Sequence, residues 1–362
     1  MRRIANIMRN TTRFKALMKL HAIFTTSLLL ASFLASAQSI SPYADALIRY
    51  ENETNQLGLS DRERIRLIAS AGIKGRLNSQ WQYQLGLSTG LKNKQNVPAI
   101  TIARINSQPR PDQDIFVQKA FLQRTSKNHT TWLGKIPWKS WQVTDAFWDR
   151  HLHPLGVHHE YKSDNAGTFV GAVLTPLDGA EHTIGKLSVL QWQHEVSLSD
   201  NISLKYSPWF AIYRGEANAR FAKRDTELDN SFANFSFLLS SGNWRLGADY
   251  SHSMTARDAE QFNKFSDQRN AWSVELAHGN LKQVGNTHAA LRLHHIERFA
   301  VVSEFAQNAV NRFATSNFKG IDLRVRRKVA QNLWAGLRLS RSYQLIGDET
   351  STRLRFEAKI SF

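Results

Sequence analysis

Cysteine is absent from the sequence of 362 residues. Small extracellular domains that cannot bury a sufficient core usually depend on disulfides, and this chain can form none. A disulfide-stapled scaffold is therefore excluded. The fold must be held together by burial and by backbone hydrogen bonds.

Long apolar runs are absent beyond the first 34 residues, and the mean hydropathy of the chain is −0.41. A transmembrane helix needs about 20 consecutive apolar residues. The apolar run at residues 22–34 is shorter and is interrupted by Thr and Ser. A helical membrane protein is therefore excluded.

Residues 1–37 have the order of a secretory signal peptide. A basic region without acidic residues precedes the apolar run, and Ala35-Ser36-Ala37 supplies the small residues of a cleavage site. A membrane anchor helix would need a longer apolar run. We therefore expect residues 1–37 to be removed on export, with Met1 or Met18 as the start. The basic residues are Arg2, Arg3, Arg9, Arg13, Lys15 and Lys19.

Acidic residues are fewer than basic ones, with 30 Asp and Glu against 47 Lys and Arg, and the net charge is +17. A pI near 10.2 often indicates a nucleic-acid partner. Export argues against that partner, and the basic residues stand at alternate positions rather than in one tract. They belong either to a solvated surface or, as their phase favours, to the inner wall of a channel.

The last stretch, residues 351–362, alternates between polar and mostly apolar side chains without a slip. Thr352, Leu354, Phe356, Ala358, Ile360 and Phe362 form the apolar row, opposite Ser351, Arg353, Arg355, Glu357, Lys359 and Ser361. A period of two is that of a β-strand. The stretch exceeds the usual 5–6 or so residues of a soluble strand and is long enough for the roughly 9–11 of a tilted membrane strand. Its end at Phe362 resembles the signature that the assembly machinery of outer-membrane barrels reads.

About fifteen segments show this alternation, and short linkers such as 75–79 contrast with long ones such as 92–113. Single-chain bacterial barrels close with an even number of strands. We predict one all-β domain over residues 62–362, a transmembrane antiparallel β-barrel of 16 strands, with 14 as the alternative. The segments are 64–74, 80–87, 114–124, 130–136, 155–162, 166–175, 183–196, 201–214, 231–240, 243–253, 270–279, 286–298, 317–328, 332–343 and 351–362.

Residues 38–61 lack clear alternation. Ser41-Pro42 is typical of a helix N-cap and first turn, and residues 43–50 could form a short helix. We expect a periplasmic or plugging segment, or a disordered leader, ahead of the barrel.

Tyr and Trp are frequent near the segment ends, where a barrel carries its aromatic girdles. Ordinary aromatic packing in a core is the alternative for each of them. The residues are Trp81, Trp132, Trp192, Trp209, Trp272, Tyr213, Tyr250 and Tyr343.

One stretch departs from simple alternation. A strand ends in Trp132-Leu133-Gly134-Lys135-Ile136-Pro137-Trp138, and Trp148-Asp149-Arg150-His151-Leu152-His153-Pro154-Leu155-Gly156-Val157 follows after a loop. This resembles a porin family of Gram-negative bacteria, in which Leu-Gly-Lys-x-x-x-Pro leads to Trp-Asp-x-Asp-Leu-x-Pro-Glu-Gly. The proline comes early here, His151 stands where the second Asp is expected, and Leu155 where Glu is expected. The matching residues are Leu133, Gly134, Lys135, Trp148, Asp149, Leu152, Pro154 and Gly156.

The resemblance covers about residues 115–162. It implies a barrel of the outer membrane, surrounded by outer-membrane lipid, that conducts small hydrophilic solutes by diffusion. Many porins are trimers, so a homotrimer is one assembly that it allows.

The loop between the two halves of this stretch could fold inward and narrow the lumen, and the size and charge of such a constriction set selectivity. The alternative is a loop at the rim with no role in the pore. The candidate constriction residues are Trp138, Trp141, Asp145, Trp148, Asp149 and Arg150.

Strand phase directs a set of basic residues into the lumen, with Asp322 and Glu357 as partial offsets. A basic wall lowers the barrier for anions, so we expect a weak anion preference. The candidate pore-lining residues are Arg292, Arg324, Arg326, Arg338, Arg353, Arg355 and Lys359.

Motifs for metal binding or catalysis are weak. His151, His153, His158 and His159 lie near Asp145 and Asp149, but their spacing matches no standard zinc pattern. No His-Glu-x-x-His occurs, and chance explains Ser251-His252-Ser253. We expect a porin with no metal, no cofactor and no enzymatic activity. The alternatives are an outer-membrane enzyme acting on lipid and a plugged structural or adhesive barrel.

Overall fold

The computed structural model describes residues 38–56, 61–91, 98–106, 113–178, 182–183, 185–215, 229–255, 265, 267–302, 305–306 and 315–362. The expected signal peptide, residues 1–37, lies outside the described residues. Among the described residues we find no helix with the length and the apolar character that a membrane crossing would need.

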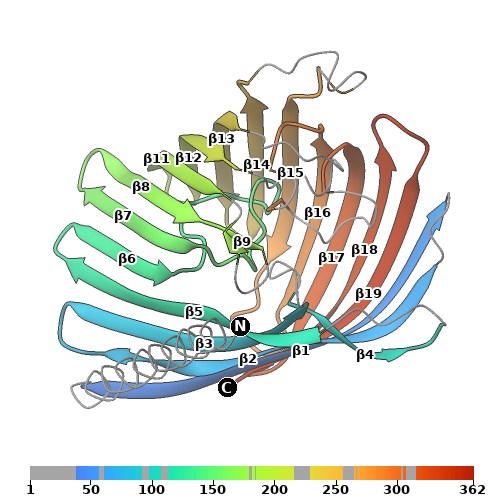
Figure 1. Ribbon diagram of the computed structural model, residues 1–362, viewed down its shortest axis with the longest axis horizontal. Coiled ribbons are helices and arrows are strands. Elements are labelled where there is room, and N and C mark those ends of the chain that lie inside the picture. The colour runs from blue at the N-terminus through green and yellow to red at the C-terminus, as the bar shows by residue number, and fades with distance from the viewer. Residues whose placement is uncertain are drawn as a thin grey trace, which may run out of the picture.

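Sixteen long antiparallel strands form the wall of a closed barrel in the described part of the chain (Figure 1). The number agrees with the prediction of 16. The strands are β1 (Ser39–Gln56), β2 (Arg62–Arg76), β3 (Trp81–Leu91), β5 (Gln113–Ser126), β6 (His129–Lys135), β7 (Leu155–Ser163), β8 (Gly167–Thr175), β11 (Lys186–Ser199), β12 (Ile202–Arg214), β13 (Asn230–Ser241), β14 (Trp244–Ser253), β15 (Asn270–Gly279), β16 (Thr287–Ile296), β17 (Phe318–Ala330), β18 (Leu333–Gln344) and β19 (Thr350–Ser361).

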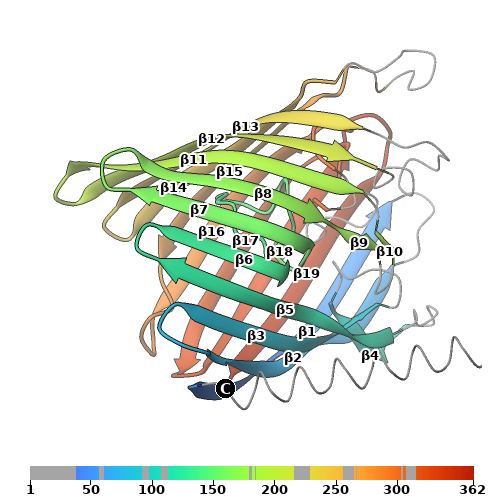
Figure 2. The ribbon, with the colours of Figure 1, turned by 60° about the vertical axis from the view of Figure 1, so that its left-hand side comes forward.

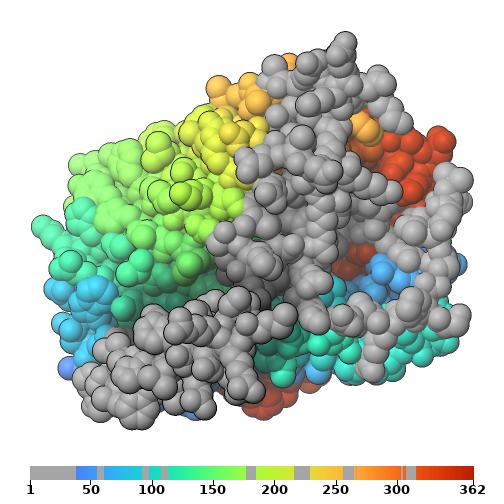
Figure 3. Space-filling view, in the orientation of Figure 1, coloured from blue at the N-terminus to red at the C-terminus, as the bar shows by residue number. Residues whose placement is uncertain are grey.

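Within the described ranges, three short strands lie outside this ring of sixteen. β4 (Ile100–Arg104) pairs with β2, while β9 (Leu177–Asp178) and β10 (His182–Thr183) pair with each other. Neighbours in the wall are neighbours in sequence. On the left side of Figure 3 the colours follow this order from cyan through green to yellow. The wall is therefore an up-and-down barrel.

The barrel is closed by β1, which pairs with β2 on one side and with β19 on the other. The expected leader or short helix at residues 38–61 is therefore wrong, since Ser39–Gln56 is a strand of the wall. Its inward row runs through Asp45, Leu47, Arg49, Glu51 and Glu53, so an apolar residue stands in a charged row. The alternation is weak for this reason, and Ser41-Pro42 lies within a strand that starts at Ser39 instead of starting a helix.

Short turns join the strands at one end of the barrel, and long connections at the other (Figure 2). Ser39 pairs with Arg76, and Ser361 with Asp45, so both ends of the wall lie at the short-turn end. Phe362, the expected assembly residue, follows β19; its N–H donates to the carbonyl of Ala44 at 2.8 Å, and its side chain is 74% exposed.

The two faces of the wall have opposite character. Large apolar side chains such as Leu190, 68% exposed, point outward, whereas Glu51 and Glu53 are fully buried inside. A bilayer offers no partner to backbone groups, and a closed ladder with an apolar outer face meets that requirement.

The aromatic residues expected at the girdles are divided between the faces. Tyr250, Trp272 and Tyr343 are on the exposed outer face. Trp132, Trp209 and Tyr213 are buried on the inner face and belong to a hydrophobic cluster within the barrel. For these three, the girdle expectation is wrong and the core alternative is right.

Candidate functional site: the lumen and the loop that crosses it

The connection between β6 and β7, residues 136–154, lies inside the barrel (Figures 1 and 2). β6 is the fifth strand of the ring and β16 the thirteenth, so the two face each other across the lumen. Asp145 of the loop accepts a hydrogen bond from Nη1 of Arg292 on β16 at 2.8 Å. The loop therefore spans the lumen from one wall to the opposite one.

Local sequence directs the chain inward at the start of this loop. Gly134 has a φ of +119°, and a Cβ there would lie 2.3 Å from the carbonyl oxygen of Ala120. Only glycine adopts this conformation without strain. The N–H of Ile136 donates to the carbonyl of Pro154 at 2.9 Å and closes the base of the loop.

Two polar side chains of the wall hold the middle of the loop. Gln191 of β11 accepts from the N–H of Trp141 and donates to its carbonyl, both at 2.7 Å. Asp249 of β14 accepts from the N–H of Val143 at 3.0 Å, and from the N–H and hydroxyl of Thr144 at 2.5 and 2.6 Å. These bonds satisfy loop groups that would otherwise be buried without partners.

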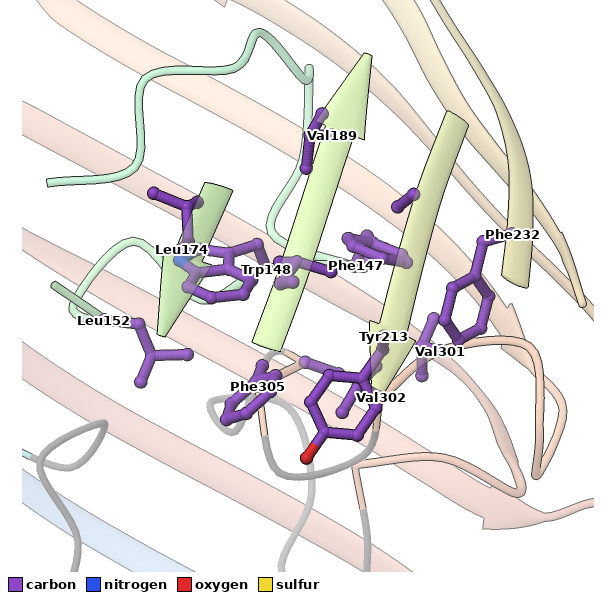
Figure 4. Packing of buried hydrophobic residues seen from close by; sticks show 14 of the residues in the cluster. Phe147, Trp148, Leu152, Leu174, Val189, Tyr213, Phe232, Val301, Val302 and Phe305 are labelled. Atoms are coloured by element: carbon purple, nitrogen blue, oxygen red, sulfur yellow. The ribbon is translucent and has the colours of Figure 1, made fainter. Parts of the chain in front are cut away.

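Apolar contacts complete the attachment (Figure 4). Trp148 is fully buried and stacks on Trp138 with 4.4 Å between ring centroids. Phe147 meets Trp209 and Phe232 edge-on at 4.8 and 5.2 Å. A packed apolar core therefore lies against the inner faces of β8 to β13.

A second connection adds to this core. The N–H of Asp149 donates to the carbonyl of Phe305 at 2.7 Å, and Val301, Val302 and Phe305 belong to the same cluster. These residues follow β16, so loops from opposite walls meet inside the barrel.

The remaining side of the lumen, from β16 through β19 to β2, is covered by charged side chains. Of the expected pore-lining residues, Arg292, Arg324, Arg338, Arg353 and Arg355 are buried on this inner face. Arg326 is largely buried there too, and Lys359 is about one-third exposed. All seven stand on the inward row that strand phase indicated, and their role in conduction stays a prediction.

Carboxylates from several strands pair with these arginines. Arg338 binds both oxygens of Asp322 at 2.7 and 3.0 Å. Nε of Arg355 donates to Glu51 at 2.6 Å. Further pairs include Arg353 with Glu53, Arg292 with Glu275, Arg49 with Glu357, Arg326 with Glu357, Arg64 with Glu51, and Arg62 with Glu53.

β1 and β2 also contribute charged residues to this wall, none of which is among the expected pore-lining residues. They are Arg49, Glu51, Glu53, Arg62, Arg64 and Arg66. Spacing at every second residue is the available signal, but on β1 it is weak, and residues 38–61 are expected to form a leader. The predicted segment 64–74 does include Arg64 and Arg66. Much of the positive charge is therefore compensated within the wall.

The candidate constriction residues have different surroundings. Trp138 and Trp148 stack in the core, and Lys205 lies 4.6 Å from the ring of Trp141. Asp149 is buried and accepts from the N–H of His151 at 2.8 Å, which shapes the loop. Among the six, Asp145 reaches the opposite wall and Arg150 is exposed to the lumen.

The loop carries groups whose charge is fixed by their surroundings. Burial alone would raise the pKa of Asp145, but the guanidinium groups around it, Arg292 first, hold that pKa well below its usual range. Burial lowers the pKa of His153 to about 3. Burial and the neighbouring Arg150 also hold the pKa of His151 well below its usual value. At neutral pH the aspartate is charged and both histidines are neutral.

A cavity of about 410 Å³ lies on the short-turn side of the loop. The loop contributes Pro137, Arg150, His151 and His153 to it, and the wall contributes charged and apolar residues that include Lys119, Arg326 and Lys359.

The histidines singled out from the sequence do not come together. His158 points inward and its Nε2 is 3.1 Å from Glu160, whereas His159 points outward, with Nε2 3.3 Å from His129 Nδ1 and Nδ1 2.8 Å from the Thr131 hydroxyl. Among the described residues, no group of three His, Cys, Asp or Glu side chains converges as metal ligands would.

Gly86-Leu87-Ser88-Thr89-Gly90 matches the Gly-x-Ser-x-Gly pattern of hydrolases. The nucleophile of those enzymes sits on a sharp turn between a strand and a helix. Here the motif runs along β3, and the Ser88 hydroxyl donates to the carbonyl of Ala69 at 3.2 Å. The pattern is therefore not a nucleophile elbow.

No family model and no curated protein matches the sequence. The fold is similar to that of solved outer-membrane porins. Pseudomonas putida OprB aligns over 92% of this chain and 96% of its own, with a TM-score of 0.59 and 8% identity. OmpF of Salmonella typhi, in a complex with daunomycin, aligns over 91% and 99%, with a TM-score of 0.55 and 8% identity. Pseudomonas aeruginosa OpdQ aligns over 89% and 98%, with a TM-score of 0.51 and 11% identity.

At identities this low, the similarity shows the fold alone: the described part of the chain forms a closed antiparallel barrel of sixteen strands. A closed barrel of this type, apolar outside and polar inside, points to the bacterial outer membrane.

Proposed function

We propose that the protein is an outer-membrane porin through which small hydrophilic solutes diffuse, with a weak preference for anions. The proposal is based mainly on the loop of residues 136–154, which crosses the lumen of a closed barrel. On one side of this loop, the inner face of the wall is lined by charged side chains. Narrowing by an inward loop and the charge at that level determine which solutes pass.

Anion preference follows from the groups that ion pairs do not neutralise. Arg338 forms an ion pair with Asp322, and Arg355 forms one with Glu51. Because these carboxylates compensate their charge, the two arginines attract mobile anions only weakly. Among the described residues, Lys119 and Arg150 make no ion pair within 4.0 Å, although both line the cavity beside the loop. A mobile anion meets a net positive potential there, and a cation meets a barrier.

Reversal potentials in planar bilayers test the proposal. Purified protein should give discrete conductance steps, and in a KCl gradient the reversal potential should take the sign set by chloride. A reversal potential of the opposite sign would contradict the anion preference and leave the pore intact.

A plugged structural barrel is the second candidate, because the packed core already fills part of the lumen. Absence of conductance steps from correctly folded protein would favour it. We propose no enzymatic role; lipid hydrolysis by the detergent-solubilised protein, in a lipase assay, would contradict this.

Export and assembly belong to the same proposal. Residues 1–37 act as a cleaved signal peptide, and Phe362 serves the barrel-assembly machinery. Amino-terminal sequencing of the protein from outer-membrane fractions should begin at Gln38. Replacement of Phe362 by Ser should lower the amount of folded barrel without changing the amount exported.

A further inference from the structure

The cavity beside the loop contains more positive charge than its own acids can balance. Its lining includes four cationic side chains, Lys119, Arg150, Arg326 and Lys359, and among the described lining residues one carboxylate, Asp45. Asp45 is already engaged, since it lies 3.0 Å from Nζ of Lys359 and accepts from the hydroxyl of Ser361 at 2.5 Å.

The other three cationic side chains have N–H groups that remain available to hydrogen-bond a ligand. Among the described residues, neither Lys119 nor Arg150 has a carboxylate within 4.0 Å; the nearest polar partner of Arg150 is His151, 3.4 Å from its Nε. Arg326 is 3.8 Å from Glu357 through Nη2, and its buried Nε has no hydrogen-bond partner in the described part of the chain. Buried donors of this kind normally have a partner.

Apolar groups complete the lining. Leu47, Ile68, Pro137 and Trp334 face the same space, and the guanidinium of Arg326 lies 4.4 Å from the ring of Trp334. The volume is within the range of about 300–1,000 Å³ found for small-molecule sites, which combine an apolar lining with a few polar groups. A site that binds only inorganic ions does not require apolar side chains in its lining.

We propose that this cavity is a saturable binding site for small organic anions. The anionic group faces Lys119 and Arg150, and the apolar body packs against Leu47 and Trp334. The inference rests on the proposed function, because it assumes that solutes enter the lumen, and it adds a recognised substrate class to passive diffusion.

Calorimetry on the full chain in detergent tests the site with three probes. Benzenesulfonate carries both an anion and an apolar body, methanesulfonate keeps the anion, and benzyl alcohol keeps the body. Benzenesulfonate should bind with one site per chain and more tightly than either of the others. Equal binding of benzyl alcohol, or of methanesulfonate, would overturn the proposal.

Three glutamine variants test whether benzenesulfonate binds in this cavity. Lys119→Gln and Arg150→Gln should each weaken benzenesulfonate binding about tenfold, the effect expected when one charge-assisted hydrogen bond is lost. Lys205→Gln is the matched control, because Lys205 is stacked on Trp141 and does not line the cavity. Equal weakening by all three would indicate general attraction by lumen charge and overturn the site. Circular dichroism confirms that each variant is folded.

Bilayer recordings separate this inference from the proposed function. Conductance steps that benzenesulfonate reduces in a saturable manner support both. Conductance steps that benzenesulfonate leaves unchanged, with no heat of binding, overturn the inference alone. If no steps appear, the proposed function fails, and calorimetry still decides whether the cavity binds organic anions.

Discussion

At the scale of single residues, Asp249 accepts three of the hydrogen bonds that hold the loop against the wall. The donors belong to Val143 and Thr144, residues more than a hundred positions away in the sequence. Asp249→Ala would leave those buried donors without partners, at a cost of about 1–3 kcal/mol. We expect larger and noisier single-channel conductance, because the loop is no longer held against β14. Asp200→Ala, in the exposed β11–β12 turn, is the control and should leave the conductance unchanged.

Asp145 determines how much of the charge of Arg292 is available in the lumen. The two are 2.8 Å apart, and Glu275 also contacts Arg292. Asp145→Asn should increase anion selectivity, measured as a larger chloride-directed reversal potential. Because the pKa of Asp145 is held below its usual range, the contribution of Asp145 to selectivity, measured as the difference between wild type and variant, should stay constant between pH 8 and pH 5. Reduced anion selectivity in the variant would show that the pair does not govern the pore.

The neutral histidines of the loop make stability depend on acidity. Burial lowers the pKa of His153 to about 3, whereas an unfolded histidine titrates near about 6.5. Between these values the unfolded chain binds the extra proton, so the free energy of unfolding falls as pH falls from about 6.5 towards 3. His153→Asn keeps a donor for the carbonyl of His151 and should flatten this dependence, measured as the thermal midpoint against pH. An unchanged slope would mean that other groups cause it.

At the scale of elements, β1 is held in the wall by buried ion pairs as well as by its ladder. Glu51 contacts Arg355 on β19 and Arg64 on β2, and it has no exposed surface. Glu51→Gln leaves buried guanidinium groups without their counter-charge, which costs about 3–5 kcal/mol when a buried pair is broken. We expect a lower midpoint for heat-induced loss of the compact band on gels. Glu195→Gln, at an exposed position of β11, should leave that midpoint unchanged.

Alternation was sufficient to locate the wall strands after β1, because a wall that is apolar on one side and polar on the other requires a period of two. It did not indicate the short strands β4, β9 and β10, which lie outside the wall. It failed at β1, where Leu47 stands in the inward row and Ser41-Pro42 is typical of a helix start. It also did not separate outward Trp272 from inward Trp209. Trp209 is in the middle of β12, and the core that buries it includes side chains from two loops as well as from the wall.

The site was predicted in part. Strand phase was enough to place Arg338 and Arg355 inside, but it did not indicate Asp322 or Glu51 as their partners, because that depends on register between strands. Glu51 and Arg355 are separated by 304 positions and become neighbours only when the barrel closes. The inward path of the loop depends in the same way on Asp249 and Gln191, which local sequence does not reveal.

At the scale of the whole molecule, the lumen has a packed apolar side and a charged side. Trp148 belongs to the apolar side but to no strand of the wall. Trp148→Ala removes a large buried side chain, a change that costs about 3–5 kcal/mol where it is measured in cores. We expect the variant to loosen the packing of the loops without destabilising the strands of the wall. Conductance should therefore increase, with little change in the heat-induced unfolding of the barrel. Unchanged conductance with a lower unfolding temperature would show that the core stabilises the wall instead.

Trp272→Ala is the matched control for that experiment. Trp272 is 39% exposed on the outer face and stacks with His295 at 5.7 Å between ring centroids. Its loss should leave conductance unchanged, because it does not contact the lumen.

The division of the lumen has a consequence for how solutes are oriented. A permeating molecule with one negative and one apolar end would cross with its negative end turned towards β16–β2 and its apolar end towards β8–β13. Its long axis then lies across the pore, so its length limits passage as well as its width. Among anions of equal charge and equal width, longer ones should consequently permeate more slowly, which liposome swelling with a homologous series would measure.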